Sequence, residues 1–444
     1  MSPLVHSEQG MLSQLLIRKR PNLEDSPVSR TKDKTFDISL WVMALSGIFI
    51  QFTGRLFVAE IFFVVIFLSL LTRGRLRLLI QESGIRLPVK LLILVLVSQI
   101  ASDLFRRTTP ISFLKGSLLI IFTLVNLIVI TYLVRFQLSR YLSIVVLYSA
   151  SVITSYLFQP QLFGDANPWK FGFGYPLTAV FFCVLTKKNH LKPTTIFTLC
   201  TILSGVDFLF GARNLAAITF LSGVLSALSR KVSLTHSAVS KFPVSNFKSG
   251  IKQKRSLTAQ LLLILFTGLI IFFAYKNAVT NGLLGEEEAR KYKEQTSTGT
   301  NLLFSSRSEI FSEYLAISES PIIGHGSYAP MTAEFRQKLL PWLLENNLKT
   351  NLIQLESGID YVIPVHSGIL AFWVWFGILS VPFFAYVLHK AILVIRTRAL
   401  PPIIYYFAIL ICWDVFFSPF GMYARMQYPI SIVGMILFNQ RNRN

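Results

Sequence analysis

Charged residues are scarce in this sequence. They make up 15% of the 444 residues, whereas 52% are hydrophobic. The hydrophobic residues fall in separated blocks of membrane-spanning length, which excludes a soluble globular protein and indicates a polytopic membrane protein. Acidic residues are scarcer than basic residues, with 22 Asp and Glu against 43 Lys and Arg. Such a basic excess would suggest nucleic acid as a partner for a soluble chain, but no nucleic-acid-binding motif is present and we expect no such partner.

Cysteines and metal-binding patterns are also scarce. The three cysteines, Cys183, Cys200 and Cys412, all lie inside apolar runs and do not indicate a redox compartment. The sequence lacks an Asp-x-Asp motif, a Walker motif, a Gly-x-Ser-x-Gly motif and any His/Cys cluster with metal-ligand spacing. We therefore expect no metal or other cofactor, and any chemistry has to depend on arginine electrostatics and one general base.

The N-terminus lacks the order of a signal peptide. Its apolar stretch, Met11–Ile17, precedes the basic triplet Arg18-Lys19-Arg20 instead of following it. We expect residues 1–36 to form a cytoplasmic tail.

Apolar runs of roughly 20 residues predict an all-α membrane protein with about 12 transmembrane helices. Nine are expected in residues 37–275 and three in residues 366–444, which end in a short cytoplasmic tail. If the N-terminus is cytoplasmic, most Lys and Arg fall on the cytoplasmic side, as the positive-inside bias requires. The predicted spans are approximately 38–53, 56–72, 88–102, 113–133, 141–158, 173–187, 194–211, 214–229, 257–275, 366–389, 401–417 and 424–439.

One long polar segment, residues 276–365, separates the ninth and tenth predicted spans, and this layout makes it a periplasmic loop. Ser306 and Glu309 fit a capping box, and the apolar stripe that follows predicts a helix that stops before Pro321. A second helix is expected at Met331 to Leu340, ended by Pro341. These helices could carry a site or simply cap the bundle.

Two arginines are candidates for a functional site. Arg213 lies in a very tight outer turn, Gly211-Ala212-Arg213-Asn214, where a charge so close to the hydrocarbon needs a partner. The alternative is an arginine that snorkels and anchors a helix end. Arg307 lies in the first turn of its predicted helix, where a cation opposes the helix dipole but, beside free amide donors, could build an anion site. Its alternative is an ordinary solvated side chain.

Two histidines are candidates for a base. His366 follows Pro364 and is expected to open the helix His366-Ser367-Gly368-Ile369-Leu370. The start of a helix disfavours imidazolium, so His366 should stay neutral and able to accept a proton from a hydroxyl. A structural histidine at the interface is the alternative. His325, between Gly324 and Gly326, is a second candidate for the same chemistry.

At these residues the sequence resembles the bacterial O-antigen ligase and O-antigen polymerase (Wzy-type) family of membrane glycosyltransferases. Three motifs carry the resemblance in order. The turn Gly211-Ala212-Arg213 resembles the first arginine motif of the family. The second and third are the loop series Arg307, Phe311, Pro321, Gly324, Gly326 and the series His366-Ser367-x-x-Leu370 with Gly377. Ser367 stands where Asn is more usual, and Trp375 where an acidic residue is expected.

The resemblance implies a fold like that of C-type glycosyltransferases in the bacterial inner membrane. It implies transfer of a glycan from undecaprenyl diphosphate to a hydroxyl of a second glycan, at the periplasmic face and with inversion. Arg213 and Arg307 would bind the diphosphate and stabilise its growing charge, and His366 would orient or deprotonate the acceptor. Further substrate-binding candidates are Arg55, Arg106, Lys170, His325 and Arg425.

The acceptor remains open between two activities. A polymerase would use another lipid-linked repeat unit, and a ligase would use a lipid A core sugar. The outer loop Trp169-Lys170-Phe171-Gly172 and the large loop favour the polymerase. The other expected partners are the bilayer and a chain-length regulator.

Two other classes of function are alternatives. A flippase or secondary transporter would have broken helices and ionisable groups near mid-membrane, and the few acids within the predicted spans are Glu60, Asp207 and Asp414. A scaffold protein would use the loop as a docking surface.

Overall fold

The computed structural model divides the chain into two units, Met1–Ser39 and Leu40–Asn444, and all the described residues belong to the second. The predicted tail, Arg307 and most of the predicted span 257–275 lie outside the described residues. The described residues are 40–51, 54–158, 167–188, 190–239, 266, 269, 273, 275–283, 285–296, 309–345, 362–397, 400–421 and 423–441.

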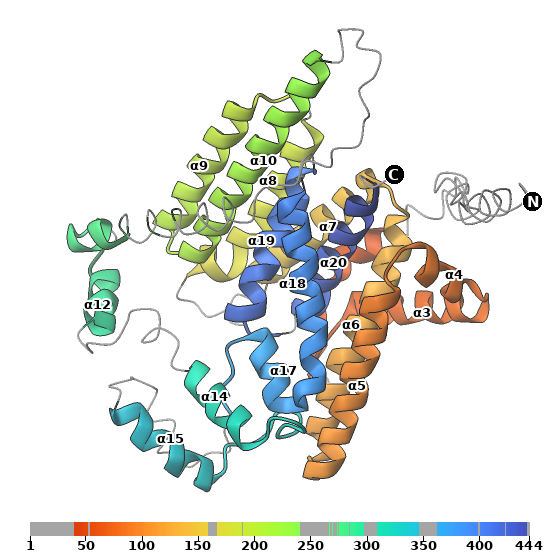
Figure 1. The fold of residues 1–444 in the computed structure, drawn as a ribbon, viewed down its shortest axis with the longest axis vertical. Helices are drawn as coiled ribbons and strands as arrows, with labels where there is room; N and C mark the ends of the chain where they lie inside the picture. Colours follow the sequence, from red (N-terminus) through yellow and green to blue (C-terminus); the bar gives the residue numbers. More distant parts are fainter. Residues whose placement is uncertain are drawn as a thin grey trace, which may run out of the picture. The chain divides into compact units, whose positions relative to one another are not determined.

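Helices account for most of the described residues of the second unit (Figure 1). The helices that coincide with predicted spans are α3 (Val58–Thr72), α5 (Arg86–Arg106), α6 (Pro110–Val134), α7 (Leu138–Phe158), α8 (Gly174–Lys187), α9 (Pro193–Leu209), α10 (Arg213–Val239), α19 (Pro402–Phe417) and α20 (Ala424–Arg441). Together with α18 (Val381–Arg396), which overlaps only part of a predicted span, they form most of the described bundle. Among them α9 packs along α10, α6 along α20 and α18 along α19. A short amphipathic helix, α4 (Arg75–Glu82), links α3 to α5.

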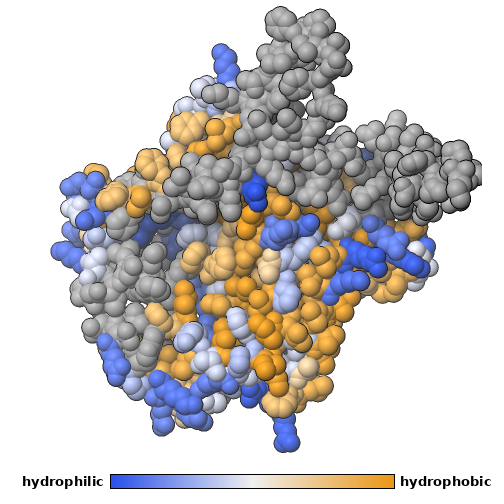
Figure 2. Space-filling model, viewed as in Figure 1, coloured by the Kyte–Doolittle hydropathy of each residue, from blue (hydrophilic) through white to orange (hydrophobic). Residues whose placement is uncertain are grey.

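Five helical segments of the described ranges are long and apolar enough to cross a membrane. They are Arg86–Arg106, Pro110–Val134, Leu138–Phe158, Trp169–Lys187 and Ile378–Arg396. Shorter apolar helices accompany them, and large hydrophobic side chains such as Phe62, Val65 and Leu104 are exposed on the surface. Figure 2 shows extended hydrophobic surface, as expected where lipid replaces water. These features agree with an all-α membrane protein, whereas the count of twelve spans stays a prediction.

Helix α6 illustrates how the sequence builds a buried helix. Pro110 stands at its first turn, where a missing N–H does no harm, and the Thr109 hydroxyl accepts the N–H of Ser112 at 3.4 Å. Inside the helix, the hydroxyls of Thr123 and Thr131 each donate at 2.7 Å to a carbonyl one turn earlier. These two hydroxyls therefore hydrogen-bond within the helix, while Asn126 donates to Glu60 of α3 at 3.2 Å, and such bonds permit burial of α6 on most sides.

The predicted first span, 38–53, is wrong. The chain there forms a single 3₁₀ turn, η2 (Val42–Leu45), and an antiparallel hairpin of β1 (Phe49–Gln51) and β2 (Arg55–Phe57). Gly54 and Arg55 interrupt the apolar run, and the aromatic and β-branched residues on either side of them favour paired strands.

The predicted span 366–389 is also wrong, because it is a helical hairpin. Helix α17 (Gly368–Phe376) ends at Gly377, and the short turn η5 (Ile378–Ser380) leads directly into α18. The ring of Phe372 on α17 lies 5.0 Å from that of Phe384 on α18, so the two helices run side by side (Figure 1). Gly377 has φ +81° and ψ −175°, a conformation open essentially only to glycine.

The predicted loop contains α12 (Gly285–Thr296), α14 (Glu309–Glu319) and α15 (Ala333–Glu345). Helix α14 stops before Pro321, as predicted, and its proposed cap Ser306 lies outside the described residues. The predicted end of the second helix at Pro341 is wrong, because α15 continues to Glu345. Pro341 and Gln337, one turn earlier, are both exposed, so water can bind the carbonyl that loses its partner.

The segment Trp169-Lys170-Phe171-Gly172 is not the outer loop we predicted. It belongs to a π-helical turn, η4 (Trp169–Phe173), that continues into α8. The Asn167 side chain starts this turn by accepting the N–H of Lys170 at 2.9 Å.

Candidate functional site

The Pro-x-x-Gly-x-Gly loop is attached to the end of α5. The Arg106 guanidinium donates to the carbonyl of Gly324 at 2.8 Å and to the hydroxyl of Ser320. The buried Asp103 carboxylate accepts both the N–H of Ser327, at 2.5 Å, and its hydroxyl, at 2.6 Å. Arg106, predicted to bind substrate, therefore holds this loop, and substrate binding by it stays a prediction.

The two glycines of this loop let it close over the end of α17. Gly324 and Gly326 have φ values of +82° and +89°. The N–H of His325 donates to the carbonyl of Val374 at 2.7 Å, and that of Gly326 to Trp375 at 2.9 Å. A Cβ at Gly324 would lie 2.6 Å from the Trp375 carbonyl oxygen. The glycines thus allow the loop to satisfy carbonyls at the end of a helix, which would otherwise lack partners.

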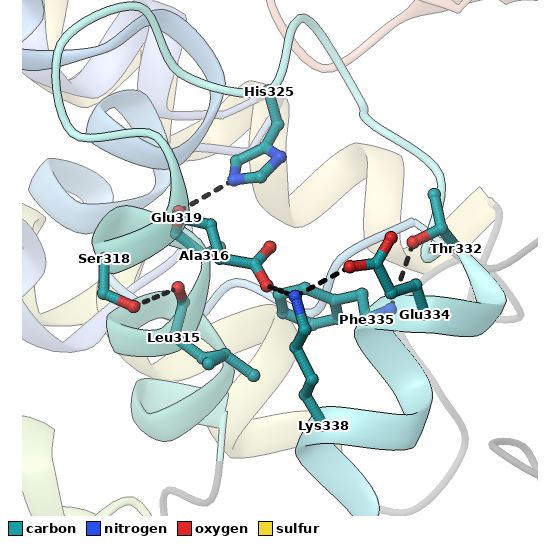
Figure 3. A network of polar contacts seen from close by, with 9 residues as sticks. All are labelled: Leu315, Ala316, Ser318, Glu319, His325, Thr332, Glu334, Phe335 and Lys338. Carbon is teal, nitrogen blue, oxygen red and sulfur yellow. Dashed lines mark hydrogen bonds and ion pairs between the residues drawn. The ribbon is translucent and has the colours of Figure 1, made fainter.

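The His325 ring connects the same loop to α14. Its Nε2 atom lies 2.7 Å from the carbonyl oxygen of Ala316 (Figure 3). The Lys338 ammonium of α15 lies between Glu319 of α14, at 2.8 Å, and Glu334, at 2.9 Å. The hydrogen bonds that the ammonium donates to these carboxylates raise the pKa of Lys338. In this structure His325 contacts a backbone oxygen, and its predicted contact with substrate stays a prediction.

Helix α14 contacts the start of α17 through Glu313, whose side chain is fully buried. Its Oε1 atom accepts the N–H of His366 at 2.7 Å and that of Ser367 at 2.9 Å. Burial raises the pKa of Glu313 to about 7, against the effect of these two hydrogen bonds. The contact joins the loop to the residue that we predicted to be the base.

His366 lies just before α17 and does not open it. The helix begins at Gly368, and Ser367 caps it, because its hydroxyl oxygen accepts the N–H of Leu370 at 3.3 Å. The same hydroxyl donates to the carbonyl of Val415 on α19 at 3.1 Å. The predicted start was therefore two residues too early, while the half-buried imidazole remains at the helix N-terminus.

Arg213 is the first residue of α10, directly after the turn that we predicted from Gly211, which has φ +76°. Its guanidinium carbon lies 4.0 Å from the centre of the Tyr275 ring. The side-chain amide of its neighbour Asn214 donates to the hydroxyl of Tyr175 at 2.5 Å. The tight turn is confirmed, and the arginine stacks on an aromatic ring.

A cavity of about 150 Å³ lies between α7, α8, α19 and α20. Tyr175 in its wall is the tyrosine bonded to Asn214. The side-chain amide of Gln427, also in its wall, donates to the carboxylate of Asp414 on α19 at 2.6 Å. The backbone carbonyl of Val415, which follows Asp414, accepts the hydroxyl of Ser367. Other lining side chains include Tyr148, Phe171, Tyr406 and Tyr423. Chains of contacts therefore connect this cavity with the segments that carry Arg213 and His366.

Arg425 is buried in an ion pair. Its guanidinium lies 3.1 Å from the Glu60 carboxylate, and the two side chains are 8% and 0% exposed. It also donates to the backbone carbonyl of Arg55 at 2.6 Å, and Asn126 donates to Glu60 at 3.2 Å. The pair holds α20 to α3 and to the β-hairpin. Substrate binding by Arg425 and Arg55, and by the exposed Lys170, whose ammonium lies 5.0 Å from the Phe171 ring centre, stays a prediction.

Breaking this pair is expected to destabilise the protein. Arg425→Met or Glu60→Gln alone should lower the free energy of unfolding by about 3 kcal/mol, because each leaves a buried polar partner uncompensated. The double variant should be more stable than either single variant. Thermal unfolding in detergent measures all three, with Lys338→Met, which removes the exposed pairs of α14 and α15, as a control that should unfold like wild type. A double variant less stable than both singles would contradict this assignment.

The structure brings two of the three predicted motifs together, and it adds Glu313 to the candidate site. The Pro-x-x-Gly-x-Gly loop and the His366 segment contact opposite ends of α17, and Arg307, outside the described residues, precedes α14 by two positions. Glu313 was not among the predicted site residues. Its signal was present, because Glu313 shares the i, i+3 face of α14 with Ile310 and Ala316.

Comparison with known proteins adds no further identification. Within the described part of the chain, no group of three or more His, Cys, Asp or Glu side chains could hold a metal ion. No protein-family model matches the chain, and no curated protein matches it at a significant level.

Proposed function

We propose that this protein is a membrane glycosyltransferase that transfers a glycan from undecaprenyl diphosphate to a hydroxyl of another lipid-linked repeat unit. The observation that carries the proposal is the arrangement around α17. The Pro-x-x-Gly-x-Gly loop binds one end of this helix, and α14 binds the other end beside His366. This supports the proposal, because parts of two of the three motifs that resemble O-antigen polymerases and ligases contact the same helix.

In the proposed reaction an acceptor oxygen attacks the anomeric carbon of the donor sugar. The new glycosidic bond forms as the bond from that carbon to the diphosphate oxygen breaks, and undecaprenyl diphosphate leaves with the electron pair. The acceptor proton passes to the His366 imidazole. Arg213 and Arg307 stabilise the charge on the leaving diphosphate, because guanidinium groups bind two phosphates with fixed geometry. Attack opposite the leaving group inverts the anomeric carbon.

The location of the site follows from the same proposal. An even number of spans, in a fold like that of C-type glycosyltransferases, would place both termini in the cytoplasm and the site at the periplasmic face of a bacterial inner membrane. The bias of Lys and Arg toward one side of the predicted layout supports this orientation. Accessibility of single cysteines introduced at Ser318 and His190 tests it. We expect a membrane-impermeant thiol reagent to label the first from the periplasm and the second only after lysis.

The choice of acceptor is tested with purified protein in lipid nanodiscs. Supplied with an undecaprenyl-diphosphate-linked repeat unit alone, the protein is expected to produce longer lipid-linked glycans. A ligase would instead need a lipid A core acceptor and give a single transfer to it. Transport of the lipid-linked unit across vesicles without any transfer would contradict the proposal and favour a flippase.

A further inference from the structure

Glu313 occupies an unusual position for an acid. It lies on the face of α14 that packs against α17, and its side chain has no exposed surface. One carboxylate oxygen binds the N–H groups of His366 and Ser367 at 2.7 and 2.9 Å. The other oxygen, Oε2, is buried and has no hydrogen-bond partner among the described residues. A glutamine would accept the same two N–H groups, so these contacts alone do not call for a charge.

The two bonds fix the main chain that carries the candidate base. The hydroxyl of Ser367 already caps the amide of Leu370, and the N–H groups of His366 and Ser367 need another acceptor, which Glu313 supplies. The amide of His366 is three covalent bonds from its ring. The carboxylate therefore holds the backbone from which the half-buried imidazole projects. A charge on this buried carboxylate acts on the ring across only a few bonds and interacts with it more strongly than it would in bulk water.

This charge lowers the stability of the protein at neutral pH. Burial raises the pKa of Glu313 to about 7, and the nearby Glu309 contributes to the rise. A carboxyl whose pKa is raised on folding stabilises the fold below its unfolded pKa, and that contribution is lost as the pH rises through about 7. Above about pH 7 the carboxyl is therefore mostly ionised, and this form costs folding free energy.

We propose that Glu313 is a positioning residue for His366: its ionised carboxylate holds the backbone of His366 and stabilises the positive charge that the imidazole gains with the acceptor proton. This inference rests on the proposed function. The donated proton stays on His366, and Glu313 acts on the base without contacting the glycan. Its position resembles that of an acid that orients a catalytic histidine, with the contact made through the main chain.

The test compares two variants with a control on the same helix. Glu313→Gln keeps an acceptor for both N–H groups and removes the charge, whereas Glu313→Ala removes both. Glu319→Gln changes an acid of α14 that contacts Lys338 at 2.8 Å instead of α17. For each protein the kcat and KM of glycan transfer, the thermal stability at pH 8 and the hydrogen exchange of residues 362–376 are measured.

We expect Glu313→Gln to lower kcat by at least about tenfold, with KM for the lipid-linked donor unchanged and thermal stability equal to or above that of wild type. Glu313→Ala should in addition speed amide exchange at His366 and Ser367, and Glu319→Gln should behave as wild type. Glu313→Gln should also alter the acid limb of the pH profile of kcat. The titratable groups near Glu313 are Glu309 on α14, His366 before α17 and His325, whose ring binds α14.

Two results separate this inference from the function on which it rests. An unchanged kcat in Glu313→Gln would overturn the positioning role and leave the glycosyltransferase in place. A lower kcat in this variant that is accompanied by a lower thermal stability would do the same. Unchanged amide exchange in Glu313→Ala would overturn it as well, independently of any activity. Wild-type protein that transfers no glycan would overturn both.

Discussion

Replacing His366 by alanine is expected to lower the rate of glycan transfer by at least about 100-fold, because a positioned general base contributes about 10² to 10⁴ in rate. The variant should still fold. Glu313 binds the backbone N–H of His366, which alanine retains, and the caps of α17 belong to Ser367 and Glu313. We therefore expect normal levels of protein in the membrane and unchanged thermal unfolding. The rate is measured on purified protein with a lipid-linked repeat unit.

His190 provides the matched control. It is exposed in the link between α8 and α9, far along the chain from both α14 and α17. His190→Ala should transfer glycan at the wild-type rate. If His366→Ala, expressed at the normal level, still produced full-length polysaccharide, His366 would not be the base.

Replacing Gly377 by alanine should have the largest effect on stability. The backbone conformation of Gly377 is one that other residues adopt at a cost of up to about 3 kcal/mol. A Cβ there would also lie 1.9 Å from the carbonyl oxygen of Ile322, which binds the N–H of Ile378 at 3.2 Å. The loop and the α17–α18 hairpin cannot both keep their places, so we expect a total loss of about 4 kcal/mol or more. Yield and thermal unfolding in detergent measure it.

Gly205→Ala is the control for this variant. Gly205 lies inside α9, and a Cβ there would meet nothing within 4 Å. Alanine is favoured over glycine within a helix by roughly 0.5 to 1 kcal/mol. We expect Gly205→Ala to be as stable as wild type or slightly more so. A Gly377→Ala protein of wild-type stability would show that the turn after α17 does not have the described conformation.

Hydropathy predicted most of the helices but not the direction of the chain within an apolar run. The predicted spans at 113–133 and 141–158 correspond closely to α6 and α7, because continuous apolar runs of that length have few other structures. The run 366–389 is equally apolar, yet the chain reverses at Gly377. Its conformation depends on Ile322, more than 50 positions earlier, and no local pattern contains that contact. The failed span at 38–53 has a local cause, since Gly54 and Arg55 mark the hairpin.

Charge in the sequence identifies candidates but not their partners. Arg106, His325 and Arg425 were selected as cations or bases on the outer side, and the structure gives each of them a protein partner. Glu313 was overlooked for the converse reason. An acid in a polar loop is ordinarily solvated, and only the packing of α14 on α17 shows that this one is buried against two amides.

The arrangement around α17 gives two of the three motifs a common physical role. The Pro-x-x-Gly-x-Gly loop satisfies the end of the helix, Glu313 satisfies its start, and both belong to the segment that begins just after Arg307. Arg307 is therefore close in sequence to Glu313, the residue that holds the backbone of His366, and a substrate bound at Arg307 would lie near Glu313.

A structure of the protein with undecaprenyl diphosphate bound tests this account most directly. We predict that the diphosphate lies within hydrogen-bonding distance of both Arg213 and Arg307, and that the His366 ring faces the same water-accessible space. A diphosphate held elsewhere, or Arg213 and His366 on opposite faces of the membrane, would contradict it.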